Sequence, residues 1–262
     1  MMHGRRKSLF IAITIMALSV NMVAFAGNET SSEKLFFENA IVQEQKKDEN
    51  SILTDENLTE IIKSSDFKIA NNQIELSYTE PVAVKDSMDK SLGNDTLYKS
   101  TTVYFIPNEN GLNELVDNIN TIRSNDQENY RTDKDNTSSI RGYISVFFNY
   151  VTLGGNEFID LTSVSGGYEV LDGSVSVRAQ SVYIAQNGRT YEHGYKTQTT
   201  DRGVSGTSWA LTPSSNWYPI QTGVGGTLVG ANYTFTMTRS GGKYWSHTIY
   251  NSVESNPLGW EI

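Results

Sequence analysis

Apolar and polar residues alternate with a period of two along much of the second half of this chain, as in half-buried β-strands. The clearest run has an apolar residue at every second position: Ala231, Tyr233, Phe235 and Met237. After Gly241-Gly242, a second run places Trp245, His247 and Ile249 on one face. Two such runs around a glycine-containing loop predict an antiparallel hairpin.

Shorter strands are predicted upstream of this hairpin. Residues 140–151 are apolar on both faces, which is typical of a strand covered on both sides. We expect further strands over residues 158–161, 168–171, 175–179 and 182–184, with breaks at Gly166-Gly167, at Asp172-Gly173 and at residues 186–188. No long amphipathic helix is predicted after residue 140. Residues 139–262 therefore predict an antiparallel β-sandwich domain.

The front half mixes the two periods. Residues 54–64 have helical spacing, with Thr54 or Asp55 as the cap, and residues 112–122 predict a second helix ending near Arg123. A hairpin is expected around residues 70–72, and a strand over 101–106 stopped by Pro107. Residues 51–123 thus predict a small α+β domain, and the whole chain is expected to be mainly β.

Charge is distributed unevenly along the chain. Residues 27–100 carry net −7, residues 101–140 net −4 and residues 141–262 net −1. The shift predicts a linker at residues 124–138 and a flexible leader at 27–50, and leaves open whether the leader's apolar cluster docks as a short helix. The acidic stretch 126–136 has calcium-ligand residue types without EF-hand spacing, so a solvated linker is favoured there.

The N-terminus has the three parts of an export signal. Arg5, Arg6 and Lys7 precede an apolar run over 9–20, and Ala24 and Ala26 supply the small residues at −3 and −1. A retained membrane anchor is the alternative, but the run is broken by Asn21 and is short for a bilayer. We predict that residues 1–26 are a signal peptide and that the product is secreted, extracellular or loosely surface-associated, with no membrane attachment after cleavage.

Composition narrows the functional classes. Removing residues 1–26 takes away three basic residues and no acidic one, which changes the net charge from −9 to −12. So acidic a chain is unsuited to nucleic acid, whose phosphates require a surplus of Lys and Arg. Because the chain has no cysteine, disulfides, thiolate metal sites and a cysteine nucleophile are excluded. Exported chains without cysteine are typical of Gram-positive bacteria.

Catalytic motifs are lacking. The predicted mature chain has two histidines, His193 and His247, without HExxH spacing, and the run 203–207 does not complete G-x-S-x-G. We therefore predict no catalytic residue, no cofactor and no metal ligand. A secreted hydrolase that uses His193 or His247 with a carboxylate is kept as an alternative.

Aromatic residues offer a better candidate site. The four tryptophans lie at or after Trp209. Trp217 and Tyr218, in a loop-like stretch between prolines, are the ligand-binding candidates, because exposed rings near amides and hydroxyls suit sugars. Trp209 and Trp245 are expected in the core, where Trp245→Ala would cost about 3–5 kcal/mol.

The C-terminal hairpin also carries a resemblance. The run Val229-Gly230-Ala231, residues 234–239, Gly241-Gly242, Trp245 and Asn251 resemble the C-terminal end of small, secreted, uncharacterised proteins of Gram-positive Firmicutes. The likeness covers residues 140–253 and is clearest over 223–251. It implies a signal peptide and a Tyr/Thr/Trp-rich β domain, and it carries no active site to transfer.

The sequence as a whole favours a secreted, non-catalytic protein that binds or interacts outside the cell. The export signal makes a cell-surface or wall glycan, or a protein, the expected partner. A carbohydrate-binding module centred on Trp217 and Tyr218 is the first alternative and the hydrolase is the second.

Overall fold

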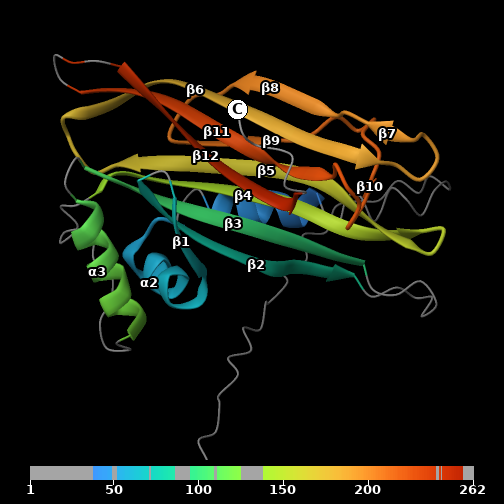
Figure 1. Ribbon diagram of the computed structural model, residues 1–262, viewed down its shortest axis with the longest axis horizontal. Helices are drawn as coiled ribbons and strands as arrows, with labels where there is room; N and C mark the ends of the chain where they lie inside the picture. The colour runs from blue at the N-terminus through green and yellow to red at the C-terminus, as the bar shows by residue number, and fades with distance from the viewer. Residues whose placement is uncertain are drawn as a thin grey trace, which may run out of the picture.

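The computed structural model describes residues 38–48, 52–70, 72–85, 95–108, 111–124, 138–239, 242 and 244–255. Two antiparallel sheets pack face to face, and helices cover the outer face of the larger sheet (Figure 1). The fold is mostly β with a small helical N-terminal part, as the sequence predicted. The predicted signal peptide at 1–26 lies outside the described residues.

The larger sheet has the order β1-β2-β3-β4-β5-β10, and β9 also pairs with β5. Its strands are β1 (Asp66–Ala70), β2 (Gln73–Lys85), β3 (Asp95–Pro107), β4 (Ser138–Leu153), β5 (Asn156–Val170), β9 (Ser208–Leu211) and β10 (Ile220–Gln221). The smaller sheet has the order β12-β11-β6-β7, and β8 also pairs with β6. Its strands are β6 (Val175–Arg189), β7 (Tyr195–Lys196), β8 (Thr199–Gly203), β11 (Leu228–Arg239) and β12 (Tyr244–Ser255).

The main core lies between the two sheets. β4 contributes Ile144, Val146 and Phe148 to it, and β11 contributes Tyr233 and Phe235 from the facing sheet. The opposite face of β11 and β12 is polar and exposed, with the hydroxyls of facing residues hydrogen-bonded across the hairpin. The alternation predicted for this hairpin is confirmed, because one parity faces apolar side chains and the other faces water.

A second apolar cluster covers part of the outer face of the larger sheet. α2 (Asp55–Ser64) and α3 (Leu112–Ser124) pack there against Leu76, Val103 and Phe105, at one end of the sheet (Figure 1). Both helices confirm the predicted periodicity. Arg123 complements the carboxyl end of α2, where its Nη1 donates to the carbonyl oxygens of Ile62 and Ser65, both at 2.9 Å.

The predicted boundary between two domains does not divide the larger sheet. β3, from the front unit, pairs with β4, from the back unit, along the register from Leu97↔Asn149 to Pro107↔Ser138. Because adjacent strands of one sheet share their backbone hydrogen bonds, residues 51–123 and 139–262 are joined by more than a connecting segment. Most of the predicted linker, residues 125–137, lies outside the described residues.

Two predicted breaks are wrong. Gly166-Gly167 lies within the continuous strand β5, where a Cβ on Gly166 would overlap the Trp209 indole. These glycines let a neighbouring segment approach closely. The stretch 186–188 lies within β6, which runs unbroken through the two strands predicted at 175–179 and 182–184. The chain turns later, where Thr190 N donates to Gly194 O at 2.8 Å and Gly194 adopts φ 68°.

The expectation that Trp245 is a core residue is also wrong. Trp209 is buried in the core between the sheets, but Trp245 is 37% exposed. Trp245 lies near the start of β12, opposite Met237. At the tip of a hairpin, a strand face extends beyond the sheet that covers it, so correct parity does not guarantee burial.

The difference predicts opposite results for two aromatic residues of one hairpin. We expect Phe235→Ala, which empties a fully buried site, to lower the free energy of unfolding by about 3–5 kcal/mol. Trp245→Ala should lower it by about 1 kcal/mol or less, because its ring already contacts water. Urea titration of both variants measures this. Equal losses would contradict the packing described here.

Candidate ligand-binding cleft

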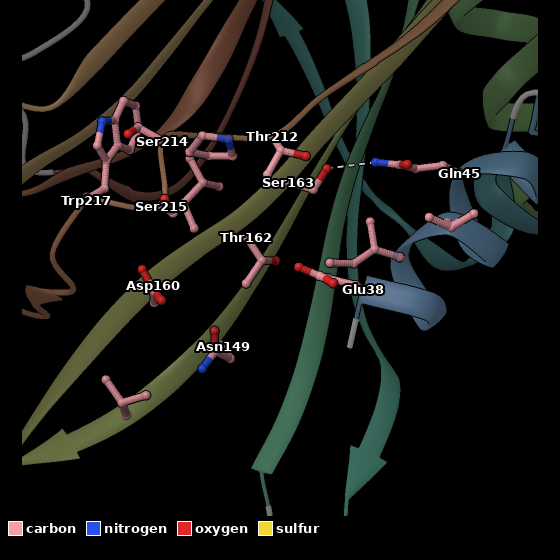
Figure 2. A pocket seen from close by; sticks show the side chains of 15 residues that line it. Glu38, Gln45, Asn149, Asp160, Thr162, Ser163, Thr212, Ser214, Ser215 and Trp217 are labelled. Atoms are coloured by element: carbon pink, nitrogen blue, oxygen red, sulfur yellow. Dashed lines mark hydrogen bonds between the residues drawn. The ribbon is translucent and has the colours of Figure 1, made fainter. Parts of the chain in front are cut away.

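A cleft of about 660 Å³ opens on the outer face of the larger sheet, away from α2 and α3. β4 and β5 line it, the helix of residues 38–48 forms one wall, and the loop 212–217 forms another (Figure 2). Its volume is in the range of small-molecule sites. The lining mixes aliphatic side chains with hydroxyls, amides, carboxylates and one indole.

The cleft follows from an interruption along the edge of β5. β10 pairs with residues 158 and 159, and β9 pairs with residues 164–167. Between these pairings the chain leaves the sheet as the loop that carries Trp217. A bulge in the β4–β5 ladder, between the pairs Phe147↔Ser163 and Phe148↔Leu161, coincides with this gap. Bulges reorient side chains and often occur beside functional sites.

Two glutamines of the smaller sheet and its loops complete the backbone hydrogen bonding here. Gln186, which is fully buried, accepts from Leu161 N at 2.5 Å and donates to Tyr218 O at 2.8 Å. Gln198 donates to the same carbonyl at 2.9 Å and accepts from Tyr218 N at 2.6 Å. The loop beside the cleft is therefore held by a buried amide network, which fixes the position of neighbouring Trp217.

The floor of the cleft carries polar groups. Asn149 and Asp160 are cross-strand partners on β4 and β5 and face the cleft (Figure 2). Burial raises the pKa of Asp160, partly offset by a hydrogen bond that Gln186 Nε2 donates to its Oδ1 at 3.2 Å. Thr162 Oγ1 is buried and has no hydrogen-bond partner among the described residues. Such groups can hydrogen-bond a polar ligand.

The helix of residues 38–48 is the wall that the sequence did not place. Asp48 Oδ1 lies 2.5 Å from Lys99 Nζ, and Ser145 Oγ donates to Asp48 Oδ2 at 3.2 Å. Gln45 Nε2 donates to Ser163 Oγ at 2.7 Å (Figure 2). The prediction of a flexible leader is thus corrected for residues 38–48, while residues 27–37 lie outside the described part. The decisive contacts are long-range, so no local pattern signals them.

The two predicted binding residues have different surroundings. Trp217 lines the cleft, as expected for a ligand-binding residue. Tyr218 does not line it. The Tyr218 ring packs on His193, with 4.4 Å between the ring centroids, and is 42% exposed. Adjacent residues of an extended loop point to opposite sides, which separates the two rings.

The histidines kept for the hydrolase alternative are far apart in the fold and neither lines the cleft. His193 lies in the exposed turn before β7, packed on Tyr218. His247 is half-buried on β12, hydrogen-bonded to Gln73 Oε1, and burial lowers the pKa of its imidazole. Within the described ranges, no group of three or more His, Asp or Glu residues is arranged to hold a metal ion. The acidic stretch considered for calcium falls outside them.

Comparison of the chain with protein-family models, with curated proteins and with solved structures finds no match. The resemblance to secreted Firmicutes proteins therefore stays a prediction. Over the part of the chain that the structure describes, no helix has both the length and the apolar character needed to cross a membrane.

The burial of Asp160 predicts a pH-dependent stability difference. Because its folded-state pKa lies above the unfolded value, ionisation of this carboxyl costs stability as the pH rises through the folded pKa. Asp160→Asn should therefore raise the free energy of unfolding at pH 7, by about 1 kcal/mol, and the gain should vanish near pH 3, where both states are protonated. Urea titrations at the two pH values measure this.

Asp201→Asn, at an exposed position of β8, is the matched control and should change stability by less than about 0.5 kcal/mol. A loss of stability in Asp160→Asn at pH 7 would show instead that the ionised carboxylate supports the fold.

Proposed function

We propose that this protein is an exported, non-catalytic protein that binds a carbohydrate in the cleft between β4, β5 and the helix of residues 38–48. The observation that carries the proposal is the placement of Trp217 beside amide, hydroxyl and carboxyl groups in one cleft. Sugars present apolar C–H faces and many hydroxyls, so they bind where an aromatic face adjoins polar side chains.

The polar groups of the cleft suit this ligand class. Asn149 offers both a donor and an acceptor, and Thr162 offers a hydroxyl without a partner among the described residues. The carboxyl of Asp160 adds a hydrogen-bond acceptor for a sugar hydroxyl. A purely apolar ligand would leave these groups buried and unpaired, which is unfavourable.

The hydrolase alternative has less support. It requires a histidine beside a carboxylate in an open cleft. His193 packs on an aromatic ring and His247 bonds to an amide, and the cleft lining given by the described residues contains neither.

Export rests on residues 1–26 and has a direct test. Expressed with its complete N-terminus in a Gram-positive secretion host, the protein should accumulate in the medium with Gly27 as its first residue, because signal peptidase cuts after Ala26. N-terminal sequencing measures this, and Ala26→Lys should retain the uncut chain. A medium fraction that still begins at Met1 would contradict the proposal.

Carbohydrate binding is tested on the full mature chain with a glycan array, followed by calorimetry on the best ligand. Trp217→Ala should weaken binding at least about tenfold, the factor equivalent to 1.4 kcal/mol of lost ring contact. Tyr218→Ala should change the affinity less than about threefold, because its ring lies outside the cleft.

Because Trp217 also packs against the core, Asn149→Ala is the second variant and should weaken binding with the ring intact. The proposal is overturned if no glycan binds, or if Tyr218→Ala weakens binding as much as Trp217→Ala does.

A further inference from the structure

The outer face of the larger sheet changes character along its length. Beneath α2 and α3 it presents Leu76, Val103 and Phe105, the apolar floor expected under a permanently packed helix. Beneath the helix of residues 38–48, the same faces of β3, β4 and β5 present mainly polar side chains: Lys99, Thr101, Ser145, Ser163 and Ser165. This polar stretch is called the hydroxyl floor below.

The helix of residues 38–48 is attached to the sheet mainly by polar contacts. Its apolar contribution is small, with Ile41 packed on Leu97 and Phe147, while neighbouring Val42 is 47% exposed. The closest contacts are the ion pair of Asp48 with Lys99 and the hydrogen bond from Gln45 to Ser163. A polar ligand that offers the same groups can replace such contacts.

Open space remains on both sides of this helix. The 660 Å³ cleft lies on one side, and a second cavity of about 270 Å³, lined by Ser165 and Trp209, lies on the other. Val42 and Gln45 line both spaces, so the helix crosses a longer groove and divides it. Ser165 Oγ is buried and, among the described residues, has no hydrogen-bond partner.

Lys99 gives the groove its charge preference. Its side chain is 2% exposed, and its ammonium contacts Asp48 at 2.5 Å and Glu44 at 3.4 Å. Three carboxylates around the groove, those of Glu38, Glu44 and Asp48, belong to the helix and would leave with it. Glu80, the cross-strand partner of Lys99, and Asp160 would stay on the sheet.

We infer that the groove is a binding site for a uronate-containing oligosaccharide, and that the helix of residues 38–48 occupies this site in cis. The inference rests on the proposed function and extends its cleft beneath the helix. The sugar carboxylate takes the place of Asp48 on Lys99, and ring hydroxyls bond the hydroxyl floor. Since β3, β4 and β5 are paired on both edges over most of the floor, a peptide strand has no backbone groups to pair with there.

The test compares binding of a tetrauronate with binding of a neutral tetrasaccharide of the same linkage, by calorimetry on the full mature chain. Asp48→Asn weakens the attachment of the helix and leaves Lys99 in place, so it should raise tetrauronate affinity by about tenfold. Glu56→Gln, an exposed change on α2, should leave the affinity unchanged. A purely structural role for Asp48 predicts lower or unchanged affinity.

A tethered helix provides the second arm. The chain has no cysteine, so Gln45→Cys with Ser163→Cys introduces two unique thiols that a short bifunctional reagent can join. The joined protein should lose tetrauronate binding, while the same variant blocked by a monofunctional reagent should keep it. Hydrogen exchange of residues 41–48 should increase when tetrauronate saturates the wild-type chain.

The outcomes separate the two proposals. If neither saccharide binds, the proposed function fails. If the neutral saccharide binds as well as the tetrauronate and Asp48→Asn changes nothing, the inference alone is overturned. Displacement of the helix by a poly-glutamate peptide in place of the tetrauronate would overturn the assigned ligand class.

Discussion

Burial of the central strand β4 on both faces is the constraint on which the rest of this structure depends. One parity of its side chains packs against the smaller sheet, and the other must be covered from outside. A strand covered on both sides requires a second layer of secondary structure on each side. The smaller sheet supplies the inner layer, and the helices supply the outer one.

The outer layer is divided between two kinds of packing. α2 and α3 cover an apolar area, where burial of hydrocarbon itself stabilises the contact. The helix of residues 38–48 covers hydroxyls and Lys99, where each buried polar group must find a partner to offset the loss of water. Apolar packing is hard to exchange, whereas a polar contact can be replaced by another partner with the same groups.

The buried pair of Lys99 and Asp48 shows the same balance. Removing both charges from water is costly, and their attraction offsets the cost only with good geometry and further hydrogen bonds. Here Ser145 and Glu44 contribute those further contacts. Such a pair is better suited to fixing where a segment sits than to adding net stability, which accords with a helix that positions one wall of a cleft.

The sequence by itself determined the local elements. The alternation in β11 and β12, the helical spacing in α2 and α3, and the turn after Ala70 depend on neighbours within a few residues, so periodicity identifies them. Trp217 was found for the same reason, because its loop has a local composition that strands and helices lack. These parts of the fold and of the site follow from which side of its own element each residue occupies.

Only the tertiary structure decided which surfaces meet. Whether an apolar position is buried depends on a distant segment that covers it, and therefore Trp209 is buried while Trp245 is exposed. Gly166 allows a close approach within a strand where the local pattern predicted a break. Asp48 meets Lys99 across 51 residues of sequence, and the cleft exists because β9 and β10 pair with separate parts of β5. Periodicity carries no information about these contacts, because side-chain direction is a local property and its covering partner is not.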